Sequence, residues 1–211
     1  MIYVCVTHLK RKQAMAKERD FLIHPLYIKI TLVLASITAL FLGFSFAYIY
    51  SRVQNGETPV DIPFLFYANT ILLLGSSYTL IQTKKAYEND QTSRYKLLLW
   101  ATMILSVIFL IAQIIAWKQM IQMNIGLTSS NLASYLYVIS AIHLAHVIGG
   151  IPFLGFFIRD AKKRLVEPAS VLLYLSDPDK KRRLMVLSIY WHFIDALWIY
   201  LIIFFLVNRM I

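Results

Sequence analysis

Three histidines and one aspartate stand in two strongly apolar stretches of this sequence. His143 and His146 are three residues apart in SYLYVISAIHLAHVIGG, and His192 and Asp195 are three residues apart in YWHFIDALW. Side chains of these types can ligate a metal or haem, relay protons, or hydrogen-bond to one another across helices. An ionised carboxylate in lipid is costly unless it faces protein, water or a partner. The four residues are therefore the first candidates for a site.

The composition around them is that of a membrane protein. Of the 211 residues, 59% are hydrophobic and 15% are charged, whereas a soluble domain has about 25% charged residues. A single cysteine, Cys5, excludes an intrachain disulfide and a CxxC metal or redox motif. The net charge of +10 indicates basic loops that set membrane topology rather than a nucleic-acid-binding surface.

Five stretches are long and apolar enough to cross the hydrocarbon core, which takes about 20 residues. We expect a basic cytoplasmic segment over residues 1–27, followed by an all-α membrane domain over residues 28–208. The short connections predict that successive helices pack antiparallel in one bundle. The predicted spans are residues 28–50, 62–82, 96–117, 131–158 and 184–208.

Lysine and arginine are unequally distributed between the two sides that five spans define. The N-terminal segment and the loops after the second and fourth spans hold 18 of the 21 basic residues. The other three, Arg52, Lys118 and Arg209, fall on the opposite side. Because basic loops tend to stay in the cytoplasm, we expect the N-terminus in the cytoplasm and the C-terminus outside.

Polar residues elsewhere in the spans predict contacts between helices. Asn69, Ser76 and Thr79 recur at helical spacing in the second span and share a face. Small and polar residues of this kind are typical of helix–helix interfaces in membranes. Gln113, in the third span, has a side chain that is able to hydrogen-bond to a neighbouring helix, but this signal is not specific.

Depth in the membrane suggests how the histidines and the aspartate pair. With a rise of about 1.5 Å per residue, His146 and Asp195 lie roughly 18 Å and roughly 16 Å from the cytoplasmic ends of their helices. His143 lies at roughly 22 Å and His192 at roughly 12 Å. We therefore expect a hydrogen bond between His146 and Asp195, with His143 and His192 packed close by. A bis-histidine haem b site and a metal site built from all four residues are the alternatives.

Two of these segments resemble the signature of subunit III of haem–copper oxidases. YWHFIDALW (190–198) is similar to the Trp-His-Phe-Val-Asp-x-x-Trp of that family, in which Trp191 and Trp198 are the flanking tryptophans. HLAHVIGG (143–150), which contains Gly149, resembles the family's His-Gly-x-His-Val-x-x-Gly.

Two further segments resemble the same family and occur in the family's order. NTILLLGSSYT (69–79) is similar to Asn-Thr-x-x-Leu-Leu-x-Ser-Ser-x-Thr, and AYIYSR (47–52) is similar to the Ala-Tyr-x-x-x-Arg that ends the preceding helix. The resemblance extends over about residues 25–208. Many members have seven spans, and this chain resembles the five-helix bacterial form.

The resemblance implies a role in aerobic respiration. The chain would be the non-catalytic subunit III of a bacterial aa3-type cytochrome c oxidase in the inner membrane, where it would support O2 reduction and proton pumping by subunit I. It would bind no metal or cofactor itself, and haem a, haem a3 and copper are expected in partner subunits. The expected partners are subunit I as the main contact, subunit II, other respiratory subunits and membrane phospholipids, but no nucleic acid.

Other functions fit the same pattern of spans. A quinol oxidase subunit III differs only in the electron donor, which binds other subunits. A nitric-oxide-reductase-associated relative of subunit III is a third reading. From a different class, a haem-b membrane anchor would use the intramembrane histidines as ligands. A transporter is less favoured, because the spans hold a single acidic residue, Asp195, and show no inverted repeat.

Overall fold

The computed structural model describes residues 24–165 and 168–210, and its ordered elements are all helices. The chain divides into two compact units, residues 1–38 and 39–211. Most of the predicted basic segment, residues 1–23, lies outside the described residues. The helices are α2 (Pro25–Asn55), α3 (Phe64–Glu88), α4 (Thr92–Gln122), α5 (Asn131–Arg164), α6 (Pro168–Leu175) and α7 (Pro178–Met210).

Five of these helices confirm the predicted spans. α2, α3, α4, α5 and α7 are each long and apolar enough to cross a membrane. The helices extend beyond the apolar stretches, because a helix needs no hydrophobic side chains where it leaves the hydrocarbon core. α4 has 31 residues and is roughly 46 Å long, whereas the core is about 30 Å thick.

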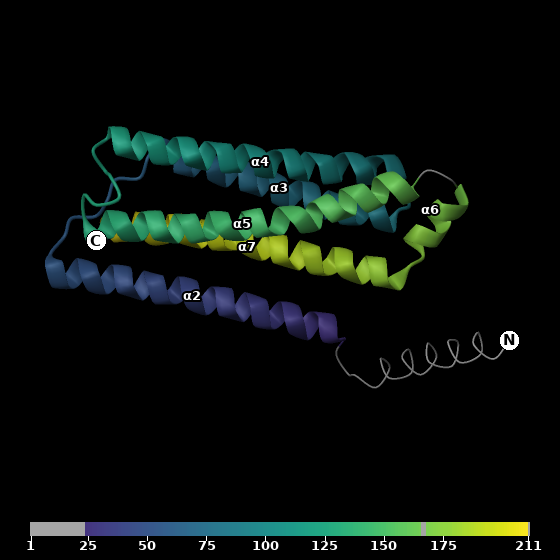
Figure 1. Cartoon of the computed structure of the whole chain (residues 1–211), viewed down its shortest axis with the longest axis horizontal. Helices are drawn as coiled ribbons and strands as arrows, with labels where there is room; N and C mark the ends of the chain where they lie inside the picture. Colours follow the sequence, from purple (N-terminus) through teal and green to yellow (C-terminus); the bar gives the residue numbers. More distant parts are fainter. Residues whose placement is uncertain (1–23, 166–167, 211) are drawn as a thin grey trace. The chain divides into compact units, whose positions relative to one another are not determined.

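Four helices of the second unit form a closed bundle (Figure 1). α3 packs against α4 and α7, and α5 packs against the same two helices. The sequential pairs α3–α4 and α4–α5 are joined by short loops and therefore run antiparallel, as the sequence predicts. Large side chains that fill the middle of this bundle are fully buried, including Phe66, Leu99, Phe109, Leu136 and Trp198.

The short helix α6 lies between α5 and α7, where the sequence predicted only a loop (Figure 1). Its Tyr174 is 3% exposed and accepts, at its backbone carbonyl, a hydrogen bond of 3.1 Å from the Tyr87 hydroxyl. Burial raises the pKa of the Tyr174 hydroxyl above its usual value. The ammonium group of Lys180, which forms an ion pair with Asp160, lies 5.4 Å from the centre of the Tyr174 ring. Eight residues are too few to show helical periodicity in a sequence.

The opposite end of the bundle is tied together by the loop between α2 and α3. Glu57 accepts hydrogen bonds from Asn131 Nδ2 at 2.8 Å and from the backbone N–H of Leu132 at 3.1 Å. These contacts place a carboxylate at the N-terminus of α5, where free N–H groups and the helix dipole favour a negative charge. In the same loop, Asp61 forms an exposed ion pair of 3.0 Å with Arg209 at the end of α7.

We predict that Glu57→Ala lowers the free energy of unfolding by about 1 kcal/mol, because it removes two hydrogen bonds between this carboxylate and the start of α5, where Ser130 is the N-cap. Asp61→Ala is the matched control, because it removes a carboxylate from the same loop but breaks only an exposed ion pair, worth about 0.5 kcal/mol or less. Denaturation of the purified chain in mixed micelles, followed by circular dichroism, measures both. Equal losses for the two variants would show that the hydrogen bonds of Glu57 to α5 add no stability beyond that of an exposed ion pair.

Candidate functional site

Most of the residues singled out by the sequence lie on the inward faces of α3, α4, α5 and α7, whereas Gly149 is exposed. On α7, Trp191, Asp195 and Trp198 are buried, with 4%, 4% and 1% of their surface exposed. His192 is half-buried. On α5, His143 is completely buried. The geometry of these side chains decides between a ligand site and a set of contacts between helices.

Two tryptophans of α7 donate hydrogen bonds to hydroxyl groups of α3. Trp191 Nε1 lies 3.0 Å from Ser76 Oγ, and Trp198 Nε1 lies 3.2 Å from Thr70 Oγ1. Residues seven apart lie on nearly the same face of a helix, so both indoles face α3. An indole N–H buried in an apolar medium needs an acceptor, and the two hydroxyls supply it.

The aromatic ring of Trp198 is also the centre of an aromatic cluster. It stacks on Phe66 with ring centres 5.7 Å apart and meets Phe109 edge-on at 5.3 Å. The ring of His143 lies 4.8 Å from it on the third side. Trp198 therefore joins α3, α4 and α5 to α7 at one level of the bundle.

His143 is bound to the backbone of α7. Its Nε2 lies 3.1 Å from the carbonyl oxygen of Ile194. Because a carbonyl oxygen only accepts, the proton is on Nε2 and Nδ1 is left as an acceptor. Nδ1 is buried and has no hydrogen-bond partner within the part of the chain that the structure describes.

His192 and Asp195 share a partner on α3. The hydroxyl of Ser77 lies 2.5 Å from His192 Nδ1 and also reaches the carboxyl group of Asp195. The second carboxyl oxygen, Oδ2, is buried without a partner among the described residues. The titratable pair of α7 is therefore directed towards α3.

The predicted hydrogen bond between His146 and Asp195 is not formed. His146 Nδ1 instead donates to the carbonyl oxygen of Ile142 in its own helix at 2.7 Å. The two residues lie at similar depths, but depth does not specify the direction of a side chain around the helix. His146 lies about 60° around α5 from His143, and only His143 faces the backbone of α7. Asp195 meets Ser77 of α3 rather than a histidine of α5.

The polar residues of α3 divide between two neighbouring helices. Asn69 Nδ2 donates to Gln113 Oε1 of α4 at 2.8 Å, and the hydroxyls of Thr79 and Thr102 are 2.8 Å apart. Ser76 faces α7 instead, as described above for Trp191. The predicted interhelical bond of Gln113 is thus confirmed, and its partner is Asn69. Thr70 and Ser77 were not predicted to bind specific partners, but they contact Trp198 and His192 of α7.

Gly149 and Gly150 differ in their surroundings. A Cβ at Gly150 would lie 2.8 Å from the Trp191 ring and 3.0 Å from the Tyr190 ring. A Cβ at Gly149, the glycine chosen from the sequence, would meet nothing within 4 Å. The close approach of α5 and α7 therefore depends on Gly150. Tyr190 also spans this contact, because its hydroxyl donates to the carbonyl oxygen of His146 at 2.8 Å.

The arrangement links four helices through hydrogen bonds between their side chains and backbones. Within residues 24–165 and 168–210, no group of three or more His, Cys, Asp or Glu side chains is placed to hold a metal ion. Four buried polar atoms near the centre keep unused hydrogen-bonding capacity: Asn69 Oδ1, Gln113 Nε2, His143 Nδ1 and Asp195 Oδ2.

The sequence of this chain is similar to the sequences of several known proteins. Cytochrome c oxidase subunit 3 of Bacillus subtilis is 31% identical over 177 residues, which cover 81% of this chain and 80% of that protein. The protein of the same name from Synechocystis sp. is 28% identical over 184 residues, which cover 82% and 72% of the two chains. Cytochrome bo(3) ubiquinol oxidase subunit 3 of Buchnera aphidicola is 26% identical over 139 residues, which cover 65% of this chain and 66% of that protein. No family model matches the sequence.

We predict that Gly150→Ala destabilises the bundle by about 1–3 kcal/mol, the usual cost of overpacking a filled interior. The added methyl would push the Trp191 ring away from α5 and strain its hydrogen bond to Ser76. Gly149→Ala is the matched control and should leave stability nearly unchanged or slightly raised, because alanine favours a helix. Thermal unfolding in detergent, with tryptophan fluorescence as the signal, separates the two. A larger loss for Gly149→Ala would contradict this packing.

We also predict that Ser77→Ala costs about 1–3 kcal/mol, because it leaves both His192 and Asp195 without their shared partner. Ser106→Ala is the control: Ser106 is buried, whereas Ser77 is half-buried, and the Ser106 hydroxyl donates only to the Thr102 carbonyl of its own helix. Denaturant titration of both variants in mixed micelles gives the two free energies of unfolding. If Ser106→Ala cost as much as Ser77→Ala, the link between α3 and α7 would not be specific.

Proposed function

Because this chain belongs to the subunit III family of haem–copper oxidases, we propose that it is the non-catalytic third subunit of a bacterial aa3-type cytochrome c oxidase. The family assignment rests on 31% identity to the Bacillus subtilis protein over four-fifths of both chains. The chain is a multi-pass protein of the bacterial inner membrane, with five helices able to span it. Its role is to support O2 reduction and proton pumping by subunit I.

The non-catalytic role is supported by how the polar residues are used. The Nε2 of His143 is occupied by a backbone carbonyl, and its ring is packed between Phe109 and Trp198. A bis-histidine haem needs imidazoles that face a space wide enough for a porphyrin. These contacts instead favour a bundle that packs against the subunits holding haem a, haem a3 and copper.

The orientation of the chain is part of the same proposal. The ends of α3, α5 and α7 that meet near α6 carry most of the described basic residues, among them Lys162, Lys163, Lys181 and Arg182. Arg52 and Arg209 lie at the other end. By the preference of basic loops for the cytoplasm, the α6 end faces the cytoplasm and the C-terminal end of α7 faces outward.

A quinol oxidase is the second candidate, and one observation favours it. The ubiquinol oxidase subunit of Buchnera aphidicola is nearly as similar to this chain, at 26% identity, as several of the cytochrome c oxidase subunits. The electron donor binds other subunits, so the donor is decided by the complex. Oxygen consumption by the purified complex, with reduced cytochrome c or with a quinol as donor, distinguishes the two candidates.

We predict that the full chain, tagged and purified from its own membranes, is recovered with haem-containing subunits. The chain expressed alone should show no Soret absorption. Asp195→Ala in the complex should keep the haem spectrum but shorten the time over which turnover continues, because the contact of Asp195 with Ser77 is lost. A Soret band from the chain alone, or loss of a haem from the Asp195→Ala complex, would favour the haem-b anchor.

A further inference from the structure

Three buried polar atoms inside the bundle have no hydrogen-bond partner among residues 24–165 and 168–210. They are Asn69 Oδ1 of α3, Gln113 Nε2 of α4 and His143 Nδ1 of α5. All three side chains have 0% of their surface exposed, so bulk water does not reach them from outside the bundle. A buried polar group is costly unless it is hydrogen-bonded, and these three therefore call for a common explanation.

The contacts between α4 and α5 bring two of these atoms to the same level. Gln113 stands one turn of α4 from Phe109, whose ring is 5.8 Å from the ring of His143. One turn in the other direction, Trp117 Nε1 donates to Ser140 Oγ at 3.1 Å. Ser140 is itself one turn of α5 from His143. Gln113 therefore lies in the α4–α5 interface, between the contacts that His143 and Ser140 make.

α3 brings the third atom to this level. Asn69 Nδ2 donates to Gln113 Oε1 at 2.8 Å, so the two side-chain amides lie next to each other. One turn from Asn69, the ring of Phe66 stacks on Trp198, and the His143 ring meets the same indole with ring centres 4.8 Å apart. Asn69, Gln113 and His143 are thus gathered in one region beside the aromatic cluster of Trp198.

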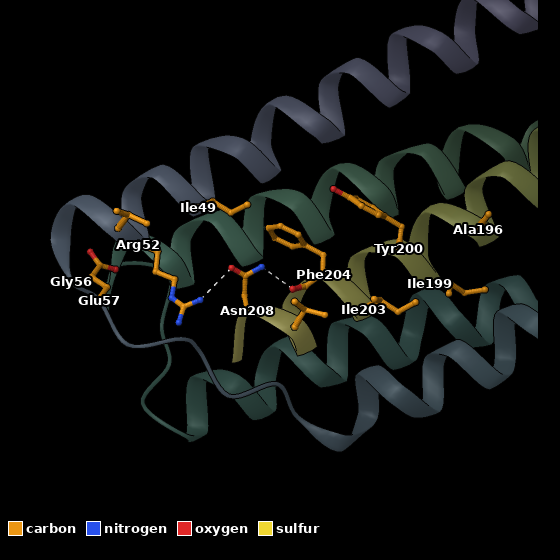
Figure 2. A pocket seen from close by; sticks show the side chains of 12 residues that line it. Ile49, Arg52, Gly56, Glu57, Ala196, Ile199, Tyr200, Ile203, Phe204 and Asn208 are labelled. Atoms are coloured by element: carbon orange, nitrogen blue, oxygen red, sulfur yellow. Dashed lines mark hydrogen bonds between the residues drawn. The ribbon is translucent and has the colours of Figure 1, made fainter. Parts of the chain in front are cut away.

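A different buried amide shows how the protein can satisfy such a group by itself. Asn208 lies beside the apolar groove between α2 and α7, where its Oδ1 accepts from Arg52 at 3.4 Å and its Nδ2 donates to the Phe204 carbonyl at 2.8 Å (Figure 2). Both polar atoms of Asn208 are therefore used. Asn69 and Gln113 use one atom each, in the bond that joins them, and the other atom of each remains available for a ligand.

The unused atoms specify what can bind. Gln113 Nε2 is a donor and Asn69 Oδ1 is an acceptor, and His143 Nδ1 is an acceptor because the ring proton is on Nε2. Turning both amide groups over leaves the same set, with the nitrogen on Asn69 and the oxygen on Gln113. The site therefore requires a small ligand that accepts one hydrogen bond and donates two.

A single water molecule meets this requirement, because it has two O–H donors and lone pairs that accept. A metal ion would offer no acceptor to the amide N–H of Gln113. A halide ion would offer no donor to Asn69 or His143, and O2 donates no hydrogen bond to either. Buried waters in proteins make about three hydrogen bonds to groups that would otherwise be unpaired, and such bridges are nearly as favourable as direct hydrogen bonds.

We propose that one internal water molecule binds between α3, α4 and α5, where it accepts from Gln113 Nε2 and donates to Asn69 Oδ1 and His143 Nδ1. Because His143 Nε2 is bonded to the Ile194 carbonyl of α7, this water completes a hydrogen-bonded connection between all four helices. It also keeps Nδ1 as an acceptor and so fixes the tautomer that binds α7. The site does not depend on which electron donor the complex uses.

The test is solid-state NMR of the full chain in lipid bilayers, with its histidines labelled with the heavy nitrogen isotope. His143→Phe assigns the His143 signals by removing them. In the wild-type chain, Nδ1 should show the shift of an unprotonated, hydrogen-bonded nitrogen and a cross-peak to water protons. Gln113→Met should remove that cross-peak, although Gln113 and His143 are not directly hydrogen-bonded.

Ser106→Ala is the matched control for the Gln113 variant. Ser106 is also buried on α4, but its hydroxyl donates only to the Thr102 carbonyl of the same helix. This variant should keep the cross-peak between water and His143 Nδ1. Circular dichroism and elution as a single species check that each variant folds. The wild-type spectrum decides the proposal even if Gln113→Met does not fold.

Each of the following results would overturn the proposal. His143 Nδ1 of the wild-type chain could carry the proton, or show no contact with water. It could instead contact a side-chain amide proton of Gln113 or Asn69, in which case the side chains satisfy one another directly. A water cross-peak that persists in Gln113→Met would place the water away from α4.

Discussion

The packing of α7 against α3 depends on two indole N–H groups that need acceptors in a medium without water. Trp191 and Trp198 find them in Ser76 and Thr70. A buried donor left without a partner in hydrocarbon costs several kcal/mol, so the two helices are favoured only in the register that satisfies both. The side chains around Trp191 and Trp198 then take their positions from that register. One example is Ser77, which lies beside His192.

α3 is the helix through which this constraint reaches the rest of the bundle. One of its faces bonds to α7 through hydroxyl groups, and another bonds to α4 through Asn69 and Thr79. Serine and threonine are small enough to let helices approach closely while still providing polar contacts. The fourth helix, α5, joins through His143 on the backbone of α7 and through the space left by Gly150. The membrane-spanning helices of this bundle are thus held together by a few specific polar contacts in addition to apolar packing.

The two ends of the bundle are held together by ion pairs and by hydrogen bonds to carboxylates instead. At one end Glu57 and Asp61 tie the α2–α3 loop to α5 and α7. At the other, Asp160 pairs with Lys180 and Arg164 beside the tyrosines that anchor α6. Arg52 differs from these residues, because its guanidinium has no carboxylate partner in the described part of the chain and faces an apolar groove.

The sequence by itself determined the five spans and the family, because length, hydropathy and four motifs in order are properties of the chain alone. It also singled out Gln113 as a residue able to hydrogen-bond to a neighbouring helix, and Trp191 and Trp198 as part of the family signature. It did not determine the partners of His146 and Asp195, the role of Gly150 or the helix α6. Depth along a helix can be counted from the sequence, but the direction of each side chain depends on how neighbouring helices are rotated and spaced. That rotation is decided only when all buried donors and acceptors are satisfied together in the tertiary structure.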